Sequence, residues 1–382
     1  SVVKKAILPL LILSLLIGLT AYKVRQIWPT ASASSAALTS LLLFVSMFGW
    51  QLIYRRFPST FDKTWLQILA WIGSTAIGLW GTFILLSLPL DLIHFALAST
   101  GSTNMLGDYG FVILITSIGI NVLGLGQTLL GPKTKHVSIA IPGLSPDLEG
   151  LRITQISDLH VGPTIQKRYV KKVASRVNDS KPDIVVFTGD LADAKASNIR
   201  THMQPLSEIR APHGMFYVTG NHEYYWGAKE LINEMSTLGF TPLIDENREL
   251  TIKSARVLVA GVTDPAGSSF YHDHRPDLTR ALKTASAMSE FDLKLLLCHR
   301  PGVSLEAEPA GIDIQFSGHT HAGQFFPFNL LIPLAHRYYR GLNRHERLWV
   351  YVNPGTGYWG PANRFAIPSE ITSVVLTRAT AV

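Results

Sequence analysis

Four long apolar runs dominate the first third of the chain. They lie at residues 6–22, about 37–54, 64–88 and 110–131. Each is nearly free of charged side chains, and each meets or approaches the roughly 20 residues that a helix needs to cross a bilayer. The first run also fits a signal peptide, but three further runs follow it, which favours an anchor. The pattern predicts an all-α transmembrane domain of about four helices over residues 1–132.

After Gly131 the pattern changes to short apolar strands that alternate with helical stretches. The expected strands cover residues 152–157, 184–187, 214–219, 294–298 and 312–316. A helix is expected at about 165–179. The alternation predicts a layered α/β domain over residues 133–382, and ligands of such domains collect at the carboxyl ends of the strands.

Charge is distributed unevenly between these two parts. Residues 1–136 hold nine basic and three acidic side chains, whereas the rest of the chain holds 25 basic and 24 acidic ones. The net charge of +7 therefore comes mostly from residues that flank apolar runs, so the expected partner is a lipid bilayer and not nucleic acid. The single cysteine, Cys298, excludes an intramolecular disulfide.

The loops between the apolar runs predict how the chain is oriented. With four spans, seven basic residues fall on the side of the N-terminus and of the α/β domain, and two fall on the other side. Positively charged loops stay in the cytoplasm. We therefore expect a multi-pass membrane protein whose α/β domain is cytoplasmic.

Side chains of the kind that bind metals follow each of the five expected strands. They are Asp158 and His160, then Asp190, then Asn221 and His222, then His299, and last His319 and His321. Each has an ordinary alternative, such as a turn residue or a buried core histidine. Five such groups at one edge of a sheet favour a shared metal site instead, because carboxylate and imidazole suit Mn, Fe or Zn.

In their order along the chain, these motifs resemble those of the calcineurin-like metallophosphoesterases. The matching stretches are Asp158-Leu159-His160, Gly189-Asp190, Gly220-Asn221-His222-Glu223, His299-Arg300-Pro301 and Gly318-His319-Thr320-His321. Gly323-Gln324 and the stretch 353–360 are similar to the membrane-anchored branch of that family. Two positions depart from the pattern, Ala322 and Cys298, and neither removes a ligand.

The resemblance implies a four-layer αββα sandwich with two divalent metal ions. It implies that Asp158, His160 and His321 hold one ion, that Asn221, His299 and His319 hold the other, and that Asp190 bridges them. A hydroxide between the ions would attack phosphorus, and His222 would assist the leaving group. Asp190 and His222 are thus the expected catalytic residues. Glu223 is expected to orient His222 or to form a surface ion pair.

The substrate is less well defined by the sequence. Phe325–Leu334 is too short to span a bilayer but apolar enough to be buried or to enter lipid. Four residues are candidates for substrate binding: Arg337, Arg340, Arg364 and Tyr224. We expect hydrolysis of a phosphodiester or pyrophosphate bond in an amphiphilic or lipid-linked substrate. The alternatives are a soluble substrate such as a cyclic nucleotide, a non-catalytic membrane scaffold, and a transporter with an accessory domain.

Overall fold

The computed structural model describes residues 16–99, 109–283, 285 and 290–379, and the chain divides into two compact units. One contains the residues up to Gly126 together with Gly360–Phe365, and we call it the helical unit. The other, the sheet unit, contains Gln127–Trp359 and the residues from Ala366 onward. The domain boundary expected after residue 132 stays a prediction. The division of the chain into two compact units falls after Gly126, within α4 (Tyr109–Leu130).

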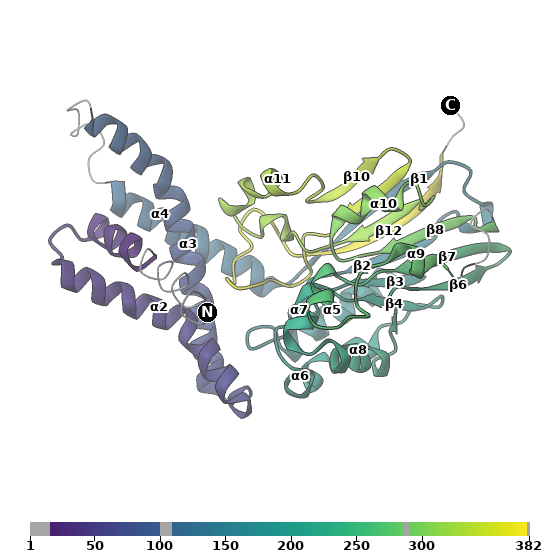
Figure 1. Cartoon of the computed structure of the whole chain (residues 1–382), viewed down its shortest axis with the longest axis horizontal. Helices are drawn as coiled ribbons and strands as arrows, with labels where there is room; N and C mark the ends of the chain where they lie inside the picture. Colours follow the sequence, from purple (N-terminus) through teal and green to yellow (C-terminus); the bar gives the residue numbers. More distant parts are fainter. Residues whose placement is uncertain (1–15, 100–108, 284, 286–289, 380–382) are drawn as a thin grey trace. The chain divides into compact units, whose positions relative to one another are not determined.

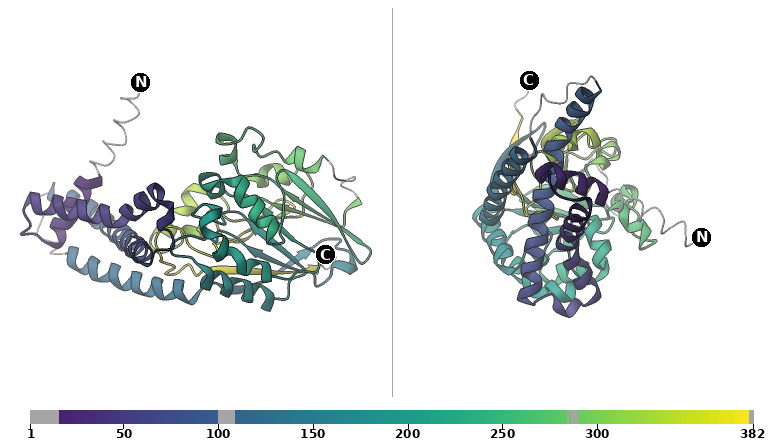
Figure 2. Two further views of the ribbon diagram at one scale, coloured as in Figure 1. Left: turned by 90° about the horizontal axis from the view of Figure 1, so that it is seen from below. Right: turned by 90° about the vertical axis from the view of Figure 1, so that its left-hand side faces the viewer.

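The helical unit is built from apolar helices. Among the described residues, three are long and apolar enough to cross a membrane: α2 (Ala33–Arg56), α3 (Thr64–Ala98) and α4 (Figures 1 and 2). They confirm three of the four predicted apolar helices. Large side chains such as Leu42, Phe95 and Val122 are exposed on them, as expected for helices that face lipid. The predicted run 6–22 lies mostly outside the described residues, and its end belongs to a helix over residues 16–27.

The sheet unit contains two six-stranded sheets. The first has the order β1-β12-β2-β3-β4-β5, with β2 to β5 parallel and β12 antiparallel to β2. Its strands are β1 (Lys133–Ile141), β12 (Glu370–Arg378), β2 (Arg152–Ile156), β3 (Ile184–Thr188), β4 (Met215–Val218) and β5 (Thr241–Pro242).

The second sheet has the order β10-β11-β9-β8-β7-β6. Its four central strands are parallel, and its two edge strands are antiparallel to their neighbours. The strands are β10 (Gly341–His345), β11 (Leu348–Val352), β9 (Ile314–Ser317), β8 (Leu293–Leu297), β7 (Ala255–Gly261) and β6 (Glu246–Ile252). The five strands expected from the sequence are β2, β3, β4, β8 and β9.

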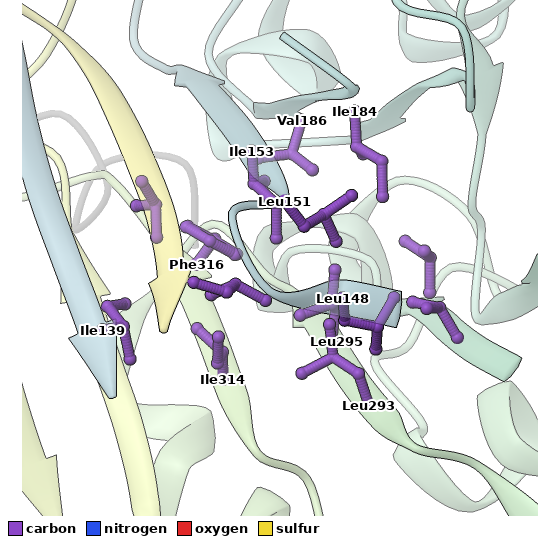
Figure 3. Close-up of a cluster of buried hydrophobic side chains, with 14 of the residues drawn as sticks. Ile139, Leu148, Leu151, Ile153, Ile184, Val186, Leu293, Leu295, Ile314 and Phe316 are labelled. Atoms are coloured by element: carbon purple, nitrogen blue, oxygen red, sulfur yellow. The ribbon is translucent and has the colours of Figure 1, made fainter. Parts of the chain in front are cut away.

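The main core lies between the two sheets. Ile153 and Val186 of the first sheet belong to the same buried cluster as Leu295 and Phe316 of the second (Figure 3). These side chains are fully buried, so removal of apolar surface from water stabilises the sandwich. Strands covered on both faces read as continuous apolar runs, which is why β3 is Ile-Val-Val-Phe-Thr.

Helices cover the outer faces of the sandwich. In α5 (Lys167–Asp179) the buried residues Val170, Val173, Ala174 and Val177 form one apolar stripe. A second buried cluster joins α9 (Leu278–Leu282) and α10 (Ser304–Ala307) to the second sheet. The other helices are α6 (Ala196–Met203), α7 (Asn221–Trp226), α8 (Ala228–Thr237) and α11 (Ile332–Ala335) (Figure 1). The predicted α/β fold is confirmed.

Candidate metal centre

The predicted site residues lie directly after strands of both sheets. Asp158 and His160 follow β2, Asp190 follows β3, Asn221 begins α7 after β4, His299 follows β8, and His319 and His321 follow β9. Five of these residues have φ between 49° and 71°, namely Asp158, His160, Asp190, His319 and His321. Side chains other than glycine rarely adopt this left-handed conformation, and such strain is concentrated at functional sites.

Asp158, His160 and His321 bring three potential ligand atoms together. These atoms lie within 4.8 Å of one another. His160 Nε2 is 3.1 Å from His321 Nε2, and His321 Nε2 is 3.4 Å from Asp158 Oδ1. All three side chains are buried. One carboxylate and two imidazoles that converge in this way form a ligand set suited to a divalent ion.

A second group of ligand atoms comes from Asp190, His299 and His319. His299 Nε2 lies 3.2 Å from Asp190 Oδ2 and 3.2 Å from His319 Nδ1. The other nitrogen of His299, Nδ1, donates to the Thr188 carbonyl at 2.8 Å. This hydrogen bond turns Nε2 toward the shared volume, as is typical of histidines that bind metals.

Two further atoms fit a metal centre. Asn221 Oδ1 is buried and has no hydrogen-bond partner within the part of the chain that the structure describes. A buried amide oxygen without a partner costs free energy, which a cation can offset. Asp190 Oδ2 lies 3.8 Å from His160 Nε2 as well as near His299, so it reaches both groups of ligands. The residues present therefore fit a metal centre that includes Asp190.

Asp193 connects this centre to His222. Its Oδ1 accepts hydrogen bonds from His222 Nδ1 at 2.5 Å and from His160 Nδ1 at 3.2 Å. Both imidazoles thereby keep Nε2 free to face the site, and His222 Nε2 lies 4.0 Å from Asp190 Oδ2. Sequence reasoning missed Asp193, although the spacing Asp190-Leu191-Ala192-Asp193 was a signal that a second carboxylate is presented by the same loop.

The charges of the site shift the pKa values of its histidines. Burial lowers the pKa of His222, but the carboxylates of Asp190 and Asp193 outweigh it and raise the pKa to about 9. Burial likewise opposes charge on His299, yet Asp190 raises its pKa to about 10. Burial and the neighbouring His299 lower the pKa of His319 to about 3. Although burial opposes its charge, His299 keeps the pKa of Asp190 well below its usual range.

Comparison with known proteins finds related sequences. A family model described as calcineurin-like phosphoesterase matches residues 151–323, a range that includes all seven predicted ligands. An uncharacterized metallophosphoesterase of Helicobacter pylori is 36% identical over 250 residues, which cover 65% of each chain. An uncharacterized metallophosphoesterase of Campylobacter jejuni is 30% identical over 343 residues, which cover 86% of this chain and 87% of that one.

The chain belongs to the calcineurin-like phosphoesterase family.

A third relative carries a more specific name. The transmembrane protein with metallophosphoesterase domain of Danio rerio is 35% identical over 278 residues, which cover 70% of this chain and 62% of that one. The chain thus spans slightly less than two thirds of the Helicobacter and Danio relatives and most of the Campylobacter one.

The contacts of Glu223 in this phosphoesterase differ from both roles that the sequence suggested. It is fully buried, and its carboxylate accepts hydrogen bonds from the backbone amides of Asp190 (3.1 Å), Leu191 (2.5 Å) and Gly220 (2.6 Å). The expected surface ion pair is therefore wrong. Glu223 joins the loop after β3 to the start of α7, and so fixes Asp190 relative to Asn221.

The residues suggested for substrate binding lie in different surroundings. Tyr224 is buried, and its hydroxyl lies 3.0 Å from Thr219 Oγ1 and 3.0 Å from His274 Nδ1. Arg337 and Arg340 are exposed beyond α11, whereas Arg364 is fully buried in the helical unit. Their roles in substrate binding stay predictions.

Apolar side chains border the metal centre. The rings of Tyr225 and Trp359 lie 5.4 Å and 5.9 Å from the ring of His222, and each of these residues is 53% exposed. Phe270, also exposed, lies 6.1 Å from Tyr225. In the apolar segment Phe325–Leu334, Leu334 is 85% exposed. The edge of the site on the His222 side is therefore aromatic.

Proposed function

We propose that this phosphoesterase uses two divalent ions to hydrolyse a phosphodiester or pyrophosphate bond in an amphiphilic substrate. The observation that carries this proposal is the position of Asp190. Its Oδ2 lies 3.2 Å from His299 Nε2 and 3.8 Å from His160 Nε2, and those two histidines belong to different ligand groups. A shared carboxylate between two sets of imidazoles is the arrangement that a two-metal phosphoryl-transfer centre requires.

Each ion would be held by residues that the sequence predicts as its ligands. Asp158, His160 and His321 would hold one, Asn221, His299 and His319 would hold the other, and Asp190 would be shared. Such ions, drawn from Mn, Fe and Zn, supply Lewis acidity and lower the pKa of water. The surrounding chain keeps the donors in place: Asp193 orients His160, and Glu223 holds the loop that carries Asp190.

His222 is the proposed general acid. With a pKa raised to about 9 it is protonated at neutral pH. Its Nδ1 proton is bound by Asp193, which leaves the Nε2 proton for the departing oxygen of the substrate. Asp193 both orients the ring and stabilises its positive charge, so it acts through His222 and not on the substrate.

The apolar border of the site supports an amphiphilic substrate. A small charged ester gains nothing from Tyr225, Phe270 and Trp359, whereas a lipid-linked ester could pack its apolar part against them. Leu330, Leu331 and Leu334 add exposed apolar side chains after the loop that carries His319 and His321. We propose that these leucines receive the acyl part of the substrate.

Substrate comparison tests this assignment. The full-length protein in detergent with Mn²⁺ is expected to hydrolyse a long-chain lipid phosphoester in mixed micelles at least about tenfold more efficiently than a cyclic nucleotide or bis-p-nitrophenyl phosphate, since each buried CH₂ contributes about 0.8 kcal/mol. Leu334→Ser should lower kcat/KM for the lipid alone. Leu305→Ser, at a leucine of α10 that is 64% exposed, is the matched control.

The outcomes separate the competing functions. Preference for the soluble ester, with Leu334→Ser equal to the wild type, would contradict the amphiphilic substrate and favour a cyclic-nucleotide or other soluble diesterase. Absence of hydrolysis with every ester and every metal would contradict the enzymatic function itself.

The location of the enzyme is also part of the proposal. The three apolar helices, together with the name of the Danio rerio relative, support association with a membrane. We propose that the chain is multi-pass and that the sheet unit is cytoplasmic, because basic residues are concentrated on the side of the sheet unit when four spans are counted.

A further inference from the structure

An ion pair of the sheet unit, Asp264 with Arg300, lies at the edge of the second sheet that carries metal ligands. Asp264 follows β7, which is parallel to β8, so it is at the same edge as His299. Its buried carboxylate accepts from Arg300 Nε at 2.8 Å and from Arg300 Nη2 at 3.2 Å. It also accepts from the Ala266 amide at 2.8 Å. These bonds fix the plane and the position of the guanidinium group.

Arg300 keeps donors that Asp264 does not use. A guanidinium group has five N–H donors, and the two bonds to Asp264 occupy two of them. Within the described residues no hydrogen bond involves Arg300 Nη1, and 38% of the side chain is exposed. A guanidinium group held on one edge by a buried carboxylate can bind an anion such as a phosphate with its other donors.

Arg300 lies close to the second group of ligands. It directly follows His299 in the chain. Burial and His299 are the main causes of the lowered pKa of His319, and the charge of Arg300 acts in the same direction. The ring of His336 lies 6.0 Å from that of His319, and burial together with Arg300 lowers the pKa of His336. The guanidinium group is thus within electrostatic reach of both rings.

Arg300 is also near the His222 side of the centre. Burial lowers the pKa of Arg300, but Asp264 outweighs burial, and Tyr225 and Asp190 also raise the pKa. The Tyr225 ring lies 5.4 Å from the His222 ring. His222 is the proposed donor to the leaving oxygen of the substrate. The positive charge of Arg300 therefore acts on the side of the site from which the leaving group departs.

We propose that Arg300 binds a phosphate group in the leaving part of the substrate, so that the enzyme prefers a pyrophosphate bond to a simple phosphodiester bond. This inference rests on the proposed function, which allows either bond. Arg300 is then a specificity-determining residue, and Asp264 is a positioning residue that acts through it.

The chemistry of the two bonds explains the preference. Hydrolysis of a pyrophosphate diester adds water across the bond between one phosphorus atom and the bridging oxygen, which gives two phosphate monoesters. The bridging oxygen leaves with the second phosphate, and this group gains negative charge. Hydrolysis of a phosphodiester instead releases an alcohol, whose oxygen takes a proton from His222. The fork of Arg300 stabilises the phosphate leaving group and has no anion to bind on the alcohol.

Two matched substrates test the proposal. Symmetrical dihexyl pyrophosphate and dihexyl phosphate share their alkyl chains and differ in one phosphate group. For the full-length protein in detergent with Mn²⁺ we would measure kcat and KM for both substrates, together with bound metal. The same measurements would be made for each variant, and the ratio of kcat/KM for the pyrophosphate to kcat/KM for the diester is the readout.

The variants separate the charge of Arg300 from its structural bonds. Arg300→Ala removes the fork but leaves the buried Asp264 carboxylate without its partner. The double variant Asp264→Asn with Arg300→Gln replaces the ion pair by two amides that can still bond to each other. Arg256→Ala is the matched control, because Arg256 lies near the opposite end of β7, is 34% exposed and also forms ion pairs, with Glu249 and Glu290.

Both variants at Arg300 are expected to lower the ratio about tenfold or more, with bound metal equal to that of the wild type. Arg256→Ala should keep the wild-type ratio. Equal losses for the two substrates, a wild-type ratio in both Arg300 variants, or a loss of metal would overturn the proposal, and so would a wild type that hydrolyses the diester alone. A wild type that hydrolyses neither substrate would instead overturn the proposed function.

Discussion

Three histidines of the centre, His160, His222 and His299, are held on the nitrogen that faces away from the ligands. His299 Nδ1 donates to the Thr188 carbonyl, while His160 and His222 both donate from Nδ1 to Asp193. These bonds fix the tautomer and the ring orientation, which leaves Nε2 for an ion or for a substrate. The difference between a ligand and a general acid therefore lies in which atoms surround Nε2.

His222→Asn separates these two roles. We expect kcat to fall about a hundredfold or more while bound metal is unchanged, because only proton transfer to the leaving oxygen is removed. The loss should be smaller for a p-nitrophenyl ester than for an alkyl ester, since p-nitrophenolate departs without a proton. Metal analysis and kcat for both esters are the measurements. Loss of metal would instead make His222 a ligand.

Protons should be released when metal binds. Because the pKa of His299 is raised to about 10, this side chain is protonated at pH 7, and its Nε2 must lose that proton to coordinate an ion. His319, with a pKa lowered to about 3, is already neutral. Affinity should therefore rise with pH between about 7 and 10. Calorimetry at pH 7 in buffers with different ionisation enthalpies should give a release of about one proton or more per chain, and a zero slope would contradict this prediction.

At the scale of elements, the strand ends of two sheets meet at one place. Glycines permit the close approach of their loops. A Cβ atom at Gly318, after β9, would overlap Ser157 Oγ and the carboxylate of Asp158, after β2. A Cβ atom at Gly220 would overlap the carboxylate of Asp190. These glycines set the distance between ligands that come from different strands.

Gly318→Ala should therefore weaken metal binding about tenfold or more, because the added methyl group displaces Asp158. Gly302→Ala is a suitable control, since that glycine follows β8 and has no described atom within 4 Å of its Cβ position. Metal retained after dialysis against a weak chelator measures the effect. Equal retention of metal in the two variants would contradict this prediction, because the loops would then separate without loss of metal affinity.

Much of this arrangement could be predicted from the sequence. Apolar runs that end in Asp, His or Asn locate β2, β3, β4, β8 and β9. Six of the seven predicted ligands fall into two groups of neighbouring side chains that could hold a metal ion. The contacts of Asp193 and Glu223 could not be predicted. In a linear sequence, a carboxylate that accepts hydrogen bonds from a distant histidine or from buried amides cannot be told from an acidic residue at the surface. Their partners depend on how the loops after β3 and β4 pack.

At the scale of the whole molecule, the two units share one chain that crosses between them more than once. The position of Gly360–Phe365 among apolar helices could not be predicted, since its composition is that of an ordinary polar loop. Its hydrogen bonds to side chains of α3 and α4 involve single polar residues, Ser74 and Asn121, which in the sequence fit contacts between helices equally well.

Cysteine labelling tests the proposed orientation. The natural cysteine, Cys298, is buried, so introduced thiols give the signal. In intact cells a membrane-impermeant maleimide should label Ser34→Cys, in the exposed first turn of α2, and should leave Ser236→Cys of α8 unlabelled until the membrane is opened. The reverse pattern would place the sheet unit on the outer side of the membrane.

The most direct measurement is the metal content of the full-length protein prepared with Mn²⁺, compared with that of Asp190→Asn. If Asp158, His160 and His321 hold one ion and Asn221, His299 and His319 hold another around a shared Asp190, the wild type contains about two ions per chain and the variant loses at least one, together with hydrolysis. A wild-type protein without bound metal, or a variant that retains both ions, would contradict the account.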